Sequence, residues 1–524
     1  MNQSPSQPES AMRKWIPLVA ICLGTFMLLV DVSIVNVALP QMATDLHSSF
    51  TSLQWVVDMY ALVLAALLMV VGTLGDRLGH RRLYLIGLVV FALASLACGL
   101  APNAGVLIAS RAVQGIGGAA MLTSTTSLLN AAYQGRDRGT AFGIWGAVSG
   151  AAAAVGPVLG GLLTDSIDWR AIFFVNLPIA AAAVVMSLRF LQNDAGRAGG
   201  RLDYAGALSF TVFAGSLTYG LIESAGDGWG STTVLGSLGL AVLALIVFVV
   251  VESRSGNPLL DLSLMRNRTF AGLSIAALLL NAAAFAHLTY TSIWLQSVLG
   301  LSPIQAGLVV CPLAISSFVV ASLSGKFFHK LAPQWPIGIG LILIGAGALL
   351  FSLVSTGSGW TVILPGLIVS GLGVGLATPI MMSSAMAAVP RQRAGMASGA
   401  INTGRQLGYA LGIAVLGTVF ANRIQSFVAA SGQVADPHQA ASALGGGRAG
   451  AVLAQVPADH RAAAEHLVHG AFAAGLDQVY LTAGIIGLVA GALVLLLVRR
   501  SDAPPPWAAA AEGGKPAEAA AGAH

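Results

Sequence analysis

The chain has 524 residues, of which 56% are hydrophobic and only 9% are charged. Soluble domains carry about 25% charged residues, so this composition excludes a water-exposed surface of the size that the chain would need. The formal net charge of +5 is too small to indicate a nucleic-acid partner. Apolar runs of membrane-spanning length recur along the chain, and we therefore expect an all-α protein of the lipid bilayer.

Fourteen segments are long enough to cross a hydrocarbon core, which takes about 20 helical residues. In chain order they are 16–38, 54–74, 83–101, 105–129, 139–163, 172–191, 204–223, 232–251, 270–293, 304–324, 336–355, 361–383, 396–420 and 478–498. Most Lys and Arg residues then fall in loops on one side, which predicts that both termini are cytoplasmic. Twelve or thirteen spans remain the alternative.

Two early loops have counterparts about 250 residues later. GDRLGHRR (75–82) corresponds to GKFFHK (325–330), and RDRGTAFG (136–143) corresponds to RQRAGMASG (391–399). Nearly equal offsets on the same membrane side indicate a duplicated six-helix unit. The predicted units are a disordered N-terminus (1–12), an N-terminal half (13–192), two inserted helices (203–252), a C-terminal half (266–500) with an outer loop (421–477), and a disordered tail (501–524).

Three charged residues lie inside predicted spans, where a charge needs a partner, a water-filled cavity or a proton. At about 1.5 Å per helical residue, Asp31, Arg111 and Asp58 all lie about 6–9 Å outward of their span midpoints. The shared level predicts a polar cluster of Asp31 with Arg111, with Asp58 nearby, which could bind and release protons. The alternatives are a static ion pair that locks two helices and, for Asp58, an acid that reaches outer water.

Five stretches together resemble the major facilitator superfamily, specifically its fourteen-segment drug:proton antiporters. They are LVDVSIVNVALP (29–40), GTLGDRLGHRR (72–82), RAVQGIGGA (111–119), GAVSGAAAAVGPVLGG (146–161) and WRAIFFVNLP (169–178). The resemblance runs along nearly the whole chain. It implies the major facilitator fold, with a substrate cavity between two six-helix halves that rock to alternate access.

The resemblance also implies roles for two glycine-containing motifs. In the first, Asp76 would pair with basic groups at an inner gating loop; the alternative is a solvated loop that fixes topology. The gating-loop candidates are Gly75, Asp76, Arg77, Gly79 and Arg81. The second motif is associated with antiporters, although helix packing alone is an equal alternative. Its candidates are Gly150, Gly156, Pro157 and Gly160.

Polar residues in or near the spans are candidates to line the substrate cavity. They are Asn36, Gln114, Glu223, Asn402, Arg405 and Gln406. Arg405 either lines the cavity or donates to the carbonyl of a helix break. Glu223 is more simply an interfacial acid, and His287 a packing residue. No acid occurs between Asp261 and Asp436, which argues against a preference for dications.

The sequence predicts a proton-coupled antiporter that exports amphipathic drugs or antibiotics, cationic ones included, across the bacterial plasma membrane. A proton-coupled symporter or an exporter of a specific metabolite is the alternative. No phosphate-binding GxxxxGK[ST] loop and no catalytic constellation is present in the sequence, so we expect neither an ATP-driven pump nor an enzyme. We expect no cofactor and no metal. The expected partners are drug molecules, protons and lipid, and the expected state is a monomer.

Overall fold

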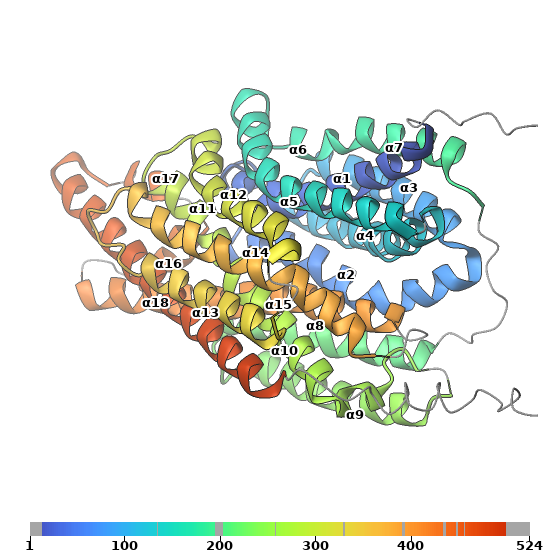
Figure 1. Cartoon of the computed structure of the whole chain (residues 1–524). Helices are drawn as coiled ribbons and strands as arrows, with labels where there is room; N and C mark the ends of the chain where they lie inside the picture. The colour runs from blue at the N-terminus through green and yellow to red at the C-terminus, as the bar shows by residue number, and fades with distance from the viewer. Residues whose placement is uncertain are drawn as a thin grey trace, which may run out of the picture.

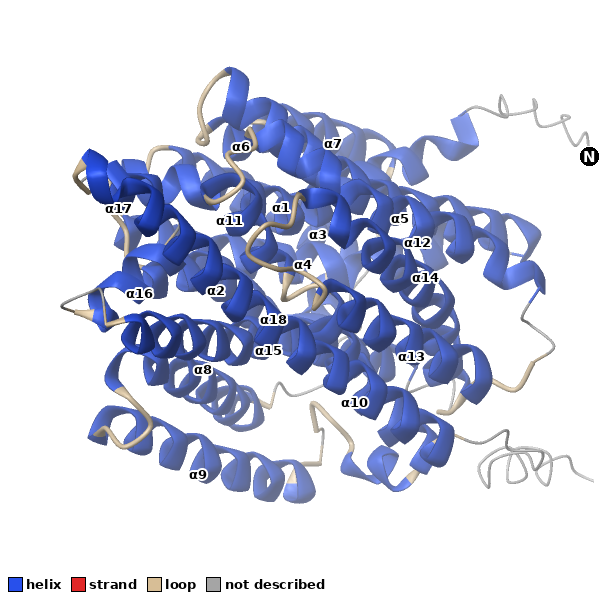
Figure 2. Ribbon diagram, turned by 90° about the vertical axis from the view of Figure 1, so that its left-hand side faces the viewer, coloured by secondary structure: helices blue, strands red, loops and turns tan. Residues whose placement is uncertain are grey.

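A computed structural model describes residues 13–133, 135–193, 203–256, 258–327, 331–389, 394–432, 436–446, 449–454 and 456–498. Every regular element in these ranges is a helix (Figure 2). The two termini that we expect to be disordered, 1–12 and 501–524, lie outside the described residues.

The helices follow one another with short connections. The first group is α1 (Ile16–Asp45), α2 (Phe50–Leu78), α3 (His80–Gly99), α4 (Ala104–Ala132), α5 (Gly135–Ser166), α6 (Ala171–Phe174), α7 (Asn176–Phe190), α8 (Tyr204–Asp227) and α9 (Thr232–Arg254). The second group is α10 (Arg268–Ala284), α11 (Leu288–Ser297), α12 (Pro303–Phe327), α13 (Gln334–Phe351), α14 (Leu364–Ala387), α15 (Ala394–Ser431), α16 (Pro437–Gly445), α17 (Ala449–Ala454) and α18 (Ala458–Leu497).

Thirteen helical stretches in the described part are long and apolar enough to cross a membrane. The remaining predicted span, 139–163, falls on α5, which is not among these thirteen and has several side chains outside the described residues. α5 is nevertheless 32 residues long and packs against both α1 and α12. It therefore has the length and the position of the fourteenth crossing.

Two of the predicted spans are interrupted rather than continuous. Val175 separates α6 from α7, and residues 285–287 separate α10 from α11. At the second break, Phe285 N donates to Asn281 O (3.3 Å) and Leu288 N donates to Phe285 O (3.1 Å). These turn bonds satisfy the backbone where the helix stops, which makes a break at membrane depth tolerable inside a protein.

The segment that we expect to be an outer loop, 421–477, is largely helical. α15 continues to Ser431, α16 and α17 follow, and α18 already begins at Ala458. Alanine is the strongest helix former and recurs through this segment. Helix propensity therefore carries α15 and α18 beyond the apolar stretches that define their spans.

Two sets of helices repeat the same packing pattern. In the first set (α1–α7), α2 and α3 pack against α4, and α1 packs against α5 and α7. In the second set (α10–α15 and α18), α12 and α13 pack against α14, and α10 packs against α15 and α18. The sets meet where α5 contacts α12 and where α2 contacts α15 (Figure 1). This pattern matches a duplicated six-helix unit.

The inserted helices α8 and α9 pack against each other at the edge of the bundle (Figures 1 and 2). α8 also contacts α2 of the first set and α15 of the second. Only 22% of the α9 span is buried, and its exposed side chains are mostly large and apolar. A helix that is apolar on its exposed face suits contact with lipid.

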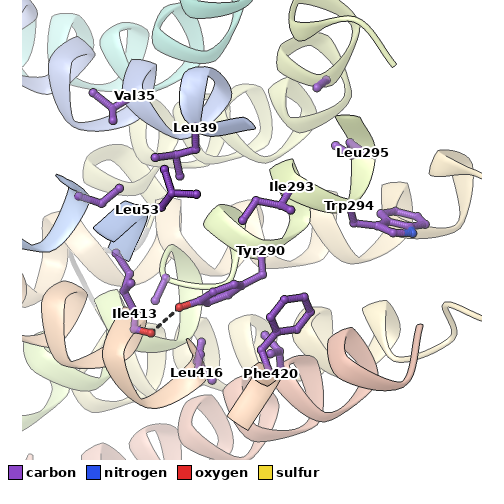
Figure 3. Close-up of a cluster of buried hydrophobic side chains, with 14 of the residues drawn as sticks. Val35, Leu39, Leu53, Tyr290, Ile293, Trp294, Leu295, Ile413, Leu416 and Phe420 are labelled. Atoms are coloured by element: carbon purple, nitrogen blue, oxygen red, sulfur yellow. Dashed lines mark hydrogen bonds between the residues drawn. The ribbon is translucent and has the colours of Figure 1, made fainter. Parts of the chain in front are cut away.

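Apolar side chains from both sets interdigitate near the turn between α1 and α2, residues 46–49. We call this end of the bundle the α1–α2 end. Figure 3 shows Leu39 of α1 and Leu53 of α2 near Ile293 of α11, and Phe420 of α15 next to the Tyr290 ring of α11. Among them, the Tyr290 hydroxyl donates to Ile413 O at 2.5 Å. The two sets are therefore sealed together at this end.

Candidate functional site

Asp31 and Arg111 form an ion pair inside the first set. Nη1 of Arg111 on α4 lies 2.5 Å from Oδ2 of Asp31 on α1, and the side chains are only 1% and 0% exposed. The proximity that we expect from their depths is therefore present. Because both charges are removed from water, deleting one partner would strand the other, at a cost of about 3–5 kcal/mol.

Three uncharged side chains complete the network around Asp31. Gln114 Nε2 donates to Asp31 Oδ1 (2.9 Å), and Gln114 Oε1 accepts from Arg111 Nη1 (2.7 Å). Asn176 Nδ2 of α7 also donates to Asp31 Oδ1 (3.0 Å), while Ser95 Oγ of α3 accepts from Gln114 Nε2 (2.9 Å). Every partner donates to Asp31, so the arrangement satisfies a charged carboxylate.

The rest of the Arg111 side chain is held by α2. Its Nε donates to Val56 O at 3.1 Å, and its guanidinium carbon lies 4.3 Å from the centre of the Tyr60 ring. A guanidinium over an aromatic face is attracted by the ring quadrupole. Arg111 thereby connects α4 to both α1 and α2.

Asp58 is buried apart from this network. Its side chain is 0% exposed, and neither carboxylate oxygen has a hydrogen-bond partner among the described residues. Asp58 lies one turn after Gln54 on α2, and Gln54 Nε2 lies 3.3 Å from the Tyr290 hydroxyl of the second set. Residues four apart share a helix face, so Asp58 is on the face of α2 that meets the second set.

A second polar contact joins the two sets at the α1–α2 end. Asn36 Nδ2 of α1 donates to the Tyr409 hydroxyl of α15 (3.2 Å), and Asn36 Oδ1 accepts from Thr289 Oγ1 of α11 (3.2 Å). Gln296 Nε2 of α11 donates to Val37 O of α1 at 2.7 Å. Asn36 is thus part of the seal between the sets.

Arg405 on α15 is the charged candidate of the second set. It is partly buried, and its Nε is enclosed without a hydrogen-bond acceptor among the described residues. No ion pair joins it to any described carboxylate. An enclosed donor without an acceptor costs about 1–3 kcal/mol.

The other cavity candidates make fewer contacts. Asn402 Nδ2 donates to Ser398 O of its own helix at 3.1 Å. Gln406 and Glu223 are partly buried, and their side chains make no hydrogen bond within the described residues. His287, at the break between α10 and α11, is 1% exposed and packs between the rings of Phe351 and Tyr480, with centroids 5.1 and 5.7 Å away.

The candidate gating loop joins α2 to α3. Gly79 has a φ of 89°, a backbone conformation that is unfavourable for a residue with a side chain. Its N–H donates to Gly75 O at 3.0 Å. A Cβ on Gly75 would come within 2.7 Å of His80 Nδ1. Arg81 donates to Leu188 O (2.7 Å) and so ties the loop to the end of α7. The Asp76 and Arg77 side chains lie outside the described residues.

The glycines of α5 allow close approach on two sides. Cβ atoms on Gly156 and Gly160 would collide with Ser33 and Ile34 of α1. Pro157 lies inside α5, and its carbonyl group faces Gly307 of α12. α5 is thus packed tightly between α1 of its own set and α12 of the second set. The surroundings of Gly150 lie outside the described part of the structure.

Several residues of these contacts are absent from the sequence prediction. Asn176 and Tyr409 are uncharged polar residues in predominantly apolar stretches, and Gln54 lies near a helix start. Their signal is only a hydrogen-bonding side chain at membrane depth, which is weaker than the signal from a charge. No group of three or more metal-binding side chains occurs in the part of the chain that the structure describes.

Two matching sets of long apolar helices, a buried charged network and a seal between the sets at one end define a multi-pass membrane transporter. The chain belongs to the Major Facilitator Superfamily, whose family pattern matches residues 21–413.

Similar proteins include bacterial drug-resistance transporters. The chain is 38% identical over 408 residues to "Multidrug resistance protein Stp" of Mycobacterium tuberculosis, covering 78% of this chain and 76% of that protein. It is 33% identical to "Tetracenomycin C resistance and export protein" of Streptomyces glaucescens, covering 92% and 91%. It is 32% identical to "Multidrug efflux pump LfrA" of Mycolicibacterium smegmatis, covering 95% and 99%.

A solved structure shares the fold. It is a bacterial homologue of the human lysosomal transporter Spinster in an inward-facing, unoccupied conformation, with a TM-score of 0.63 and 17% identity over 94% of this chain and 100% of that chain.

Proposed function

We propose that this protein is a proton-coupled antiporter that exports drugs or antibiotics from the bacterial cytoplasm. The names of the similar proteins from Mycobacterium, Streptomyces and Mycolicibacterium support drug export. Proton coupling is general in this family. The substrate would be a small molecule, the surrounding partner would be lipid, and the transporter would act as a monomer.

The observation that carries the coupling proposal is the contrast between the two buried acids. Asp31 receives donors from Arg111, Gln114 and Asn176, which suits a carboxylate. Asp58 has no donor among the described residues, and an unpaired buried charge is costly. In this state Asp58 would therefore carry the exchanged proton, while Asp31 and Arg111 form the fixed charged part of the proton pathway.

The seal at the α1–α2 end supports a state closed on the outer side. We propose that both termini are cytoplasmic, that the halves span 13–192 and 266–500, and that 203–252 is inserted between them. Transport would then separate the Asn36 and Gln54 contacts and expose Asp58 to outer water. The α2–α3 loop with Asp76 would close the opposite end, and the α5 glycines would provide the close contact on which the halves move.

The direct test uses inside-out membrane vesicles that contain the whole protein. Acidifying the vesicle lumen should drive accumulation of a fluorescent drug, and a protonophore should abolish it. Asp31→Asn should leave the protein folded, although less stable because Arg111 loses its counter-charge, and should remove this uphill transport. Full pH-driven transport by Asp31→Asn would reject the coupling role of Asp31.

The alternative is a symporter or an exporter of one metabolite. A symporter would move substrate and protons in the same direction, so the same vesicles would accumulate drug only when the outside is acidified. A metabolite exporter would leave drug susceptibility unchanged when expressed in an exporter-deficient host.

A further inference from the structure

Arg405 occupies the face of α15 that is turned toward the first set. Asn402, Arg405 and Tyr409 are spaced i, i+3, i+7 and therefore share one helix face. The Tyr409 hydroxyl accepts a hydrogen bond from Asn36 of α1, which fixes the direction of that face. On a different face of α15, a Cβ on Gly408 would meet the backbone of Leu278 on α10. Arg405 thus lies one helical turn before Tyr409, on the face of α15 that is turned toward the first set.

No described acid of the second set pairs with this guanidinium: the acids of α18, which are Asp459, Glu465 and Asp477, are exposed and make no ion pair with it. No Asp or Glu occurs between Asp261 and Asp436, so α10 to α15 contain no carboxylate. Across the interface, Asp31 is already occupied by Arg111, and Asp58 makes no ion pair with any described residue. The charge of Arg405 is therefore presented between the sets without a partner among the described residues.

We infer that Arg405 binds an anionic oxygen of the exported compound, so that amphipathic acids are preferred substrates over amphipathic cations. This inference rests on the proposed export function and specifies its substrate class. A guanidinium offers a planar fork of N–H donors that matches the two oxygens of a carboxylate and can also donate to a single phenolate oxygen. A permanent cation at the same place would meet like charge and would leave the Nε donor unmet.

The test compares two dyes with the same ring system in inside-out vesicles with an acidified lumen. Fluorescein is the anionic probe, and rhodamine 6G is the cationic probe. R405Q should reduce fluorescein transport at least tenfold, equivalent to about 1.4 kcal/mol, and should change rhodamine 6G transport by less than twofold. R405K should retain part of the fluorescein transport, because lysine keeps the charge but loses the fork.

R423Q is the matched control, since it removes a guanidinium from an exposed position of the same helix, and it should leave both dyes unaffected. Fluorescence polarisation of fluorescein on the purified protein reports binding separately from transport and should show the same loss in R405Q.

The inference is overturned if R405Q transports fluorescein normally, or if both dyes decline equally, which would mean a structural role. It is also overturned if the unmodified protein exports rhodamine 6G but not fluorescein, in which case the export function stands. If the unmodified protein transports neither dye under the gradient, the proposed function fails with it.

Discussion

The Oδ1 atom of Asp31 lies 3.0 Å from the side-chain Nδ2 of Asn176, a residue 145 positions further along the chain. Together with Gln114 and Arg111, this contact means that α4 and α7 both supply donors to one carboxylate on α1. With Ser95 of α3, which accepts from Gln114, the network links four helices of the first set, and its members can be tested separately from the seal between the sets.

Arg111→Ala should destabilise the protein by about 3–5 kcal/mol, because it leaves the Asp31 carboxylate buried without its counter-charge. The unfolding temperature of the purified protein in detergent measures this change. Arg170→Ala is the control: Arg170 is 32% exposed and lies 3.4 Å from Asp168, and an exposed pair contributes about 0–1 kcal/mol. Equal losses in both variants would argue against a special role for the buried pair.

Combining Arg111→Ala with Asp31→Asn should recover much of the stability lost in Arg111→Ala. The second change removes the stranded charge, and an uncharged amide costs less to bury. The same thermal measurement checks this. A double variant as unstable as Arg111→Ala would show that the guanidinium acts through Val56 O and the Tyr60 ring instead.

Asp58→Asn should leave the unfolding temperature nearly unchanged, because no donor among the described residues depends on its charge. It should nevertheless abolish drug accumulation driven by a pH gradient, since an amide cannot release a proton. Vesicle transport with and without the gradient measures both parts. Asp165→Asn, at an exposed position of α5, is the control. Retained uphill transport in Asp58→Asn would remove Asp58 from the coupling scheme.

Gly161→Ala should destabilise the contact between α5 and α12. A Cβ there would overlap the Ile304 Cα and the Pro303 carbonyl oxygen, and overpacking costs about 1–3 kcal/mol. Gly215→Ala on α8 is the control, because nothing lies within 4 Å of its Cβ position; there alanine should be neutral or stabilising. The unfolding temperature of Gly161→Ala should therefore be lower than that of Gly215→Ala. The reverse order would contradict the close approach of α5 and α12.

Tyr409→Phe should loosen the seal at the α1–α2 end. It removes the hydroxyl that accepts from Asn36, worth about 1 kcal/mol, which corresponds to about a fivefold shift between closed and open states. The labelling rate of a cysteine at Val35, in a background without native cysteines, should rise accordingly. Thr211→Ala, which affects only a bond within α8, should not change it. An unaltered rate in Tyr409→Phe would mean that apolar packing alone maintains closure.

Hydropathy and loop charge are sufficient to predict most of the fold, since crossing a membrane places a strict demand on length and polarity. The break between α10 and α11 could not be predicted in this way. Residues 284–288, AFAHL, contain neither Pro nor Gly, and the interruption depends on tertiary packing around His287.

The part of the site that could be predicted from the sequence is the part that depends only on how deep each residue lies in the membrane. The levels of Asp31 and Arg111 along their helices are enough to place them together. Depth does not determine the rotation of a helix about its axis, however. That rotation decides that Asp58 follows Gln54 toward the second set instead of joining the Arg111 network.

The inserted helix α8 is attached unequally to its two neighbours. Thr418 Oγ1 of α15 donates to Leu221 O of α8 at 2.9 Å, whereas α8 meets α2 through apolar side chains such as Phe210 and Leu62, with no hydrogen bond between the two helices among the described residues. A hydrogen bond depends on direction and resists sliding of the two helices, whereas an apolar contact has no preferred direction and allows it. If α2 and α15 separate during transport, we therefore expect α8 and α9 to move with α15 and to slide along α2. The two helices would then stay beside the opening between the sets and keep lipid out of it.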